Sequence, residues 1–136
     1  MRVVKYTPTE IIKIKEMLAG IMSFASQGLL EKEGEVIGEE ICKGVPKDDS
    51  FFNKIAEIIV EKGWAESAEL KENKAVLKNT AETEGLSGSS EPVCHILRGI
   101  LKKVYEKYYE GLVFVNEVQC RAVSGGDDCV FEINVI

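Results

Sequence analysis

Apolar side chains recur every three or four positions in the first part of the chain, a spacing that predicts a helical face directed toward a core. Thr7, Pro8 and Glu10 mark the helix start with an N-cap hydroxyl, a first-turn proline and a capping-box carboxylate. Because glycines interrupt the pattern, we expect two helices or one kinked helix over roughly residues 8–43. The apolar stripe consists of Ile11, Ile14, Leu18, Ile21, Met22, Ala25 and Leu29.

Gly34 and Gly38 lie four positions apart and therefore share one face of the predicted helix. Glycines at this spacing weaken a helix but allow another backbone to approach closely. The pair predicts tight packing against a neighbouring element or a second subunit. The alternative is a frayed turn at the surface.

A third helix is expected to begin at Asp48 or Asp49, either of which can cap it, and to end at Gly63. The hydrophobic period then changes. Alternating side chains over residues 64–70, a short polar turn and a returning strand over 75–82 predict a β-hairpin.

The last third of the chain repeats the order of helix and hairpin. After a glycine- and serine-rich loop, Ser90 is expected to cap a long amphipathic helix that ends at Gly111. Strands are predicted over 112–118 and 129–135, joined by a turn containing Gly125 and Gly126.

These elements predict an α+β fold, in which an antiparallel four-stranded sheet made of two hairpins packs against a helical layer. We expect residues 1–136 to form a single domain, with a helical half at 7–63 and a second half at 64–136. No internal repeat or domain linker is found.

Composition narrows the possible functions. The 136 residues carry a formal net charge of −6, which argues against direct nucleic-acid binding. No apolar run is long enough to span a membrane, and the N-terminus lacks an apolar signal region, so we expect a cytoplasmic protein. In that compartment the four cysteines are expected to be thiols or metal ligands.

Three cysteines, Cys94, Cys120 and Cys129, lie where predicted elements begin or end. Cys120 and Cys129 flank the last hairpin, and Glu117 lies close enough to join them if its strand bends or bulges. Three sulfurs and one carboxylate oxygen suit tetrahedral Zn²⁺. His95 is the alternative fourth ligand.

Free cysteines are also common as small buried apolar residues. Cys129 shares its strand face with Phe131 and Ile133, as a core residue would. Cys42 has no potential ligand nearby and is interpreted as a core or surface residue.

Several short segments resemble the 4-vinyl reductase domain, also called the hydrocarbon-binding domain. The resemblance is close over roughly residues 75–136 and looser upstream, and it implies a fold similar to that of trafficking-tether subunits. Sensors of this group hold zinc with residues that match Cys94, Glu117, Cys120 and Cys129. The segments that carry the resemblance are Asn79-Thr80-Ala81-Glu82, Pro92-Val93-Cys94 with Gly99, Glu117-Val118-Gln119-Cys120-Arg121-Ala122, Gly126, and Cys129-Val130-Phe131-Glu132-Ile133.

The function implied by this resemblance is binding of a small apolar or aromatic molecule between helices and sheet. Phenol-sensing members carry a tryptophan at the position of Leu77, so phenol recognition is not expected here. Candidate ligand-binding residues are Met22, Phe24, Phe51, Ile55, Trp64, Leu97, Leu101, Tyr105 and Phe114.

We therefore expect a non-catalytic sensor or carrier with structural zinc, forming a homodimer through the glycine-marked helices. Two alternatives remain. One is a reductase acting on a vinyl tetrapyrrole, although no nucleotide-, flavin- or cluster-binding motif is present. The other is a lipid-filled module for protein interaction or tethering.

Overall fold

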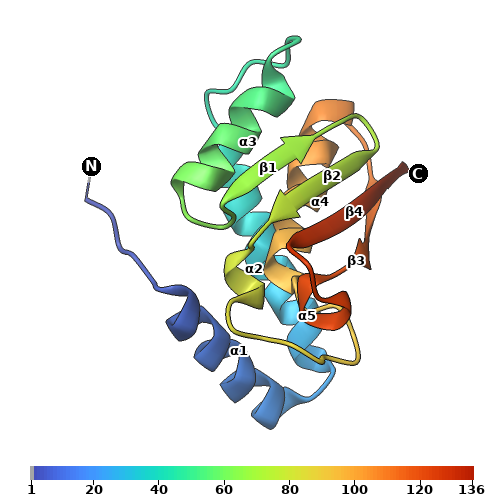
Figure 1. Ribbon diagram of the computed structural model, residues 1–136. Helices are drawn as coiled ribbons and strands as arrows, with labels where there is room; N and C mark the ends of the chain where they lie inside the picture. The colour runs from blue at the N-terminus through green and yellow to red at the C-terminus, as the bar shows by residue number, and fades with distance from the viewer. Residues whose placement is uncertain (1) are drawn as a thin grey trace.

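The fold is a four-stranded antiparallel sheet with helices packed against it, as the sequence predicts (Figure 1). The computed structural model describes residues 2–136. Along the chain the elements are α1 (Pro8–Met22), α2 (Ala25–Cys42), α3 (Phe51–Glu61), β1 (Ser67–Leu70), β2 (Lys74–Lys78), the 3-10 turn η1 (Ala81–Thr83), α4 (His95–Tyr109), β3 (Val113–Gln119), α5 (Arg121–Ser124) and β4 (Asp128–Val135).

The strands lie in the order β1-β2-β4-β3, so the two hairpins meet along β2 and β4. In this central pairing Leu77 lies opposite Cys129, and both side chains are fully buried. Helix α4 contacts β3 and β4 and also packs along α2, while α3 covers β1 (Figure 1). The core therefore lies between the sheet and the α3–α4 layer.

The glycine-marked face of α2 packs against α4 of the same chain. A Cβ atom on Gly34 would lie 2.0 Å from the carbonyl oxygen of Ile96, and one on Gly38 would lie 2.7 Å from that of Ile100. Close backbone approach is confirmed. Because α4 already occupies this face, the two glycines are not free to form the expected contact between subunits.

Helix α1 begins as predicted. The Thr7 hydroxyl accepts a hydrogen bond from the Glu10 amide, and the Glu10 carboxylate accepts one from the Thr7 amide. The expectation that its apolar stripe faces the core is wrong except at Ile11 and Leu18, which pack half-buried against it: no residue of α1 is buried, and Ile21 is 75% exposed. The helix lies at one edge of the molecule against α2 and η1, so its apolar side chains meet few neighbours (Figure 1).

Several element boundaries differ from those predicted. Ser50, not Asp48 or Asp49, is the N-cap of α3, because the Asp48 carboxylate instead accepts hydrogen bonds from Ser50. Strand β2 ends at Lys78, since Asn79 adopts a left-handed backbone with φ of 48°.

None of the helices in the described range 2–136 is both long and apolar enough to cross a membrane.

Helix α4 begins at His95 with Cys94 as N-cap, later than the Ser90 cap expected from the sequence. Its first amides are instead satisfied by a carboxylate from η1: Glu82 accepts hydrogen bonds from the amides of Ile96 and Leu97, at 3.1 and 2.7 Å. A distant acidic residue thus performs the capping that local sequence was expected to supply.

Candidate metal centre and adjoining clefts

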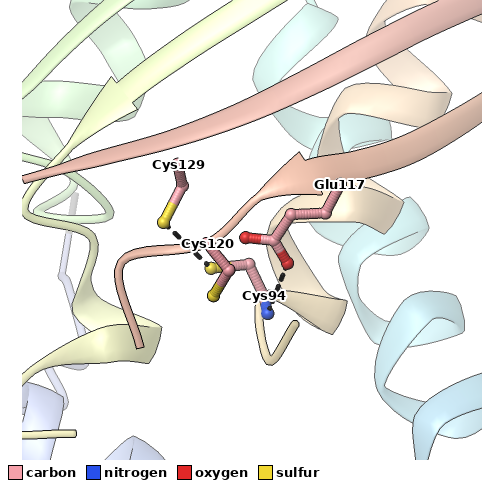
Figure 2. A group of neighbouring side chains, drawn as sticks. All are labelled: Cys94, Glu117, Cys120 and Cys129. Atoms are coloured by element: carbon pink, nitrogen blue, oxygen red, sulfur yellow. Dashed lines mark hydrogen bonds between the residues drawn. The ribbon is translucent and has the colours of Figure 1, made fainter. Parts of the chain in front are cut away.

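A β-bulge in β3 directly follows the first candidate ligand, Glu117. Glu117 pairs with Phe131 and Gln119 pairs with Val130, so Val118 is an extra residue in the ladder. This is the bend that the metal-site hypothesis required. Glu117 shares the inner face of β3 with the buried Val113 and Val115, and its side chain reaches the start of α4 (Figure 2).

Three cysteines from separate parts of the fold meet this carboxylate. Cys94 precedes α4, Cys120 links β3 to α5, and Cys129 lies on the inner face of β4. One potential ligand atom from each of the four residues lies within 4.8 Å of all the others (Figure 2). We call these residues, Cys94, Glu117, Cys120 and Cys129, the Cys3Glu cluster.

Hydrogen bonds to surrounding groups orient the cluster. The Cys94 and Cys129 sulfurs are 3.7 Å apart, and the Cys94 amide donates to Glu117 Oε1 at 3.0 Å (Figure 2). The Arg121 amide donates to Cys129 Sγ at 3.4 Å. The buried hydroxyl of Thr80 lies 3.5 Å from Cys94 Sγ and 3.8 Å from Cys129 Sγ. The Arg121 amide and the Thr80 hydroxyl thus hold the sulfurs in place from outside the cluster.

The protonation of the cluster is strongly coupled. Hydrogen bonds from the other two thiols hold the pKa of Cys120 far below its usual range. Hydrogen bonding to Cys120 raises the pKa of Cys94 well above the ordinary value and that of Cys129 to about 12. Burial, with the nearby Cys120 charge, raises the pKa of Glu117 to about 8. One thiolate shared by two thiols is therefore the favoured metal-free state at neutral pH.

The donors present fit a divalent metal ion. Glu117 Oε2 is buried without a hydrogen-bond partner among the described residues, although such atoms are normally paired. Three sulfurs and one carboxylate oxygen form a donor set typical of four-coordinate zinc. A cation at the centre would compensate the charge of ligands that cannot all be ionised in its absence.

Two other candidates lie outside the cluster. His95 follows Cys94, but its side chain lines a cleft. Burial and the nearby cations Lys15 and Arg98 lower the pKa of His95 to about 4, so its ring is neutral at pH 7. Cys42 is half-buried at the end of α2, and burial raises the pKa of its thiol to about 11.

Two clefts border α1. The Phe24 cleft, of about 340 Å³, lies between α1, the start of α2 and the segment around η1; Glu82, Val93 and His95 form its wall nearest the Cys3Glu cluster. The Trp64 cleft, of about 410 Å³, is lined mainly by apolar side chains of α1 and α2, with Trp64 and Ile96. Both clefts include Lys15 and Leu30.

The nine predicted ligand-binding residues do not share one cavity. Phe24 and Trp64 line the two clefts, and Phe114 lines a third hollow near Arg98 and Lys102. Met22 is at the surface and lines none of these three spaces. The remaining five belong to the closed core, because large side chains at helical spacing pack there against the sheet: Phe51, Ile55, Leu97, Leu101 and Tyr105.

The sequence reasoning did not identify three residues that organise this region: Lys15, Thr80 and Glu82. Lys15 of α1 forms an ion pair with Glu82, with Nζ 2.7 Å from Oε2. Thr80 and Glu82 belong to the segment that carried the family resemblance, so a signal was present. The pattern over 75–82 predicts one continuous strand with Thr80 and Glu82 on a single face, so it gives no sign of the turn in which the two residues lie.

Comparisons with known proteins agree with this architecture. Residues 73–135 match the family model of the V4R domain. No curated protein sequence matches the chain. A vinyl-4-reductase family protein from Methanocaldococcus jannaschii has a similar structure, with 24% sequence identity, a TM-score of 0.65 and coverage of 93% of this chain and 76% of its own.

Two further structures show the same fold at lower identity. The phenol-responsive sensory domain of the transcription activator PoxR, solved with phenol, is 10% identical with a TM-score of 0.73, covering 98% of this chain and 77% of its own. Subunit 3 of a trafficking protein particle complex from Naegleria fowleri, covalently bound to palmitic acid, is 14% identical with a TM-score of 0.61, covering 95% of each chain. The resemblance read from the sequence is thereby confirmed: residues 73–135 match the V4R domain family.

Proposed function

We propose that the Cys3Glu cluster holds one structural zinc ion. The observation that carries this proposal is the convergence of four donor atoms within 4.8 Å, including a buried Glu117 oxygen that has no other partner in the described chain. The four side chains would complete a tetrahedral coordination sphere and leave no position for a reacting water. The ion would therefore stabilise the fold and leave the domain non-catalytic.

We further propose that the domain binds a small hydrophobic or aromatic molecule, as a sensor or carrier. The clefts beside α1 and the phenol bound by the PoxR sensory domain support this assignment. The Phe24 cleft is the favoured site because it adjoins the residues next to Cys94. Lys15 and Glu82 on its wall already pair with each other, so a mainly apolar ligand would need to displace no hydrogen bond there.

Native mass spectrometry of protein purified without added metal tests the metal centre. We expect one zinc per chain, lost in Cys120→Ser and retained in the matched variant Cys42→Ser, because Cys42 lies outside the cluster. A wild-type protein without metal, whose four thiols all react with an alkylating agent while folded, would refute the zinc proposal.

Mass spectrometry after denaturation tests whether the protein carries a bound small molecule. We expect release of an apolar small molecule from the wild type and its loss from Ala19→Trp, since Ala19 lines the Phe24 cleft and an indole there would fill it. Lys13→Trp serves as control, because Lys13 is exposed on the same helix and lines neither of the two clefts. Equal ligand in both variants would remove the Phe24 cleft as the site, and a lipid that never exchanges would favour a tethering module.

Oligomeric state is read from the same spectra. The homodimer remains a prediction, and its interface would have to involve surfaces other than Gly34 and Gly38, which pack against α4. A cytoplasmic location is proposed as well, since a reducing compartment keeps such thiols available to zinc.

A further inference from the structure

Helix α1 borders both clefts but is weakly attached to the rest of the molecule. It contributes no buried side chain, and only Ile11 and Leu18 among its apolar residues pack, half-buried, against the core. At its end Ser23 has φ of 53°, an unusual backbone conformation for a residue other than glycine. One helix therefore forms a wall of both clefts and joins α2 through a single strained position.

A buried ion pair fastens this helix. The Lys15 ammonium contacts Glu82 Oε2 at 2.7 Å and also donates to the backbone carbonyl of Val93. The Glu82 side chain is fully buried and that of Lys15 is 11% exposed. Removing one partner of such a pair leaves the other charge buried with less compensation, so the contact is energetically significant.

Glu82 connects this ion pair to the candidate metal centre. Its carboxylate accepts hydrogen bonds from the amides of Ile96 and Leu97 in the first turn of α4, which Cys94 immediately precedes. Two residues before Glu82, the Thr80 hydroxyl contacts the sulfurs of Cys94 and Cys129. The segment 80–83 thus touches α1 on one side and the Cys3Glu cluster on the other.

We propose that the Lys15–Glu82 contact couples α1 to the metal centre: an occupied centre holds α1 closed over both clefts, and loss of the metal releases it. This inference rests on the proposed zinc site. The metal fixes Cys94, and with it the Val93 carbonyl and the α4 amides that position Glu82. Lys15 and Glu82 are positioning residues, since neither is a metal ligand, and metal occupancy regulates access to the clefts.

Zinc release tests the coupling from the side of the metal. Zinc-loaded wild type, Lys15→Met and Lys15→Arg are mixed with excess chelator, and transfer of zinc is followed. The matched control is Lys102→Met, which removes a partly buried lysine that pairs with Glu35 on α2. We expect release about tenfold faster from Lys15→Met, and near wild-type release from Lys15→Arg and Lys102→Met.

Hydrogen exchange of the zinc-loaded proteins tests the coupling from the side of α1. Amides of α1 should exchange about tenfold faster in Lys15→Met than in wild type, while amides of β4 keep their protection and show that the fold persists. Trp64, the single tryptophan of the chain, should become more accessible to acrylamide, because it lines a cleft bounded by α1.

Three results would overturn the coupling. In the first, α1 exchanges faster while zinc leaves at the wild-type rate. In the second, α1 exchange is unchanged in Lys15→Met. In the third, Lys102→Met accelerates zinc release as much as Lys15→Met does. Wild-type protein that binds no zinc is a distinct outcome, since the proposed metal centre would then fail and the coupling with it.

Discussion

Gly34 and Gly99 face each other where α2 crosses α4, and a Cβ atom on either glycine would lie 2.0 Å from a carbonyl oxygen of the other helix. Real Cβ contacts are never so short, so only hydrogen fits at both positions. This contact brings the two backbones together without intervening side chains. It also fixes α4, whose first turn carries the hydrogen bonds to Glu82.

Replacing Gly34 by alanine should therefore destabilise the protein by about 3 kcal/mol, because the helices must separate to admit the methyl group. Gly28→Ala in the same helix should stabilise it by about 0.5–1 kcal/mol, since its added methyl meets no atom within 4 Å and alanine favours the helix. Urea unfolding of both variants measures the difference. A Gly34→Ala protein as stable as wild type would contradict the close packing.

Thr80→Val should lower zinc affinity about tenfold, because the hydroxyl that contacts two cluster sulfurs is replaced by a methyl of similar size. Thr83→Val is the matched control: it also removes the hydrogen bond between the two threonine hydroxyls, but Thr83 makes no hydrogen bond to a sulfur. Competition with a zinc-binding dye gives both affinities. Equal losses would attribute the effect to the threonine pair rather than to the sulfur contact.

Cys42 should be alkylated slowly at pH 8 and tenfold faster for each added pH unit, up to its raised pKa of about 11. The sign follows from the chemistry: the thiolate reacts, and burial together with the Glu39 charge disfavours it. The rate is measured with iodoacetamide and peptide mass spectrometry on folded protein. Fast alkylation at pH 8 would show that Cys42 is more exposed than this structure indicates.

Tyr105→Phe should cost about 1 kcal/mol of stability. The Tyr105 hydroxyl donates to the carbonyl of Lys71, which lies in the turn between β1 and β2, while the ring itself is buried. Tyr108→Phe should be nearly neutral, since the Tyr108 ring joins the same aromatic cluster through Phe51 and Phe52 without relying on its hydroxyl. Thermal unfolding measures the stability of both variants. Similar losses of stability in Tyr105→Phe and Tyr108→Phe would refute a specific role for the Tyr105 hydroxyl.

Much of the fold could be predicted because its signals are local. The capping box at Thr7 and Glu10 identified the start of α1, and alternation identified the hairpins. The Cys3Glu cluster could also be predicted, since its donor types are chemically distinctive and a bend or bulge near Glu117 would bring them together.

The remaining features depend on contacts between distant parts of the chain. An apolar stripe such as that of α1 predicts a helical face, but not whether enough structure exists to cover it. Glu82 appeared as one of many acidic residues, although it caps α4 and pairs with Lys15 across 67 positions of sequence. Phe51 and Phe24 are equally apolar in the sequence, yet one is core and the other lines a cleft.

The extra residue at Val118 determines which insertions and deletions the domain can tolerate. Beyond it the ladder pairs Gln119 with Val130, which brings Cys120 alongside Cys129. Insertions at the Gly125–Gly126 turn would lengthen an exposed connection and leave both residues in place. Deletion of Val118 would close the bulge and keep Cys120 alongside Cys129, because Gln119 would still lie opposite Val130, so loss of this single codon would leave the sulfurs together.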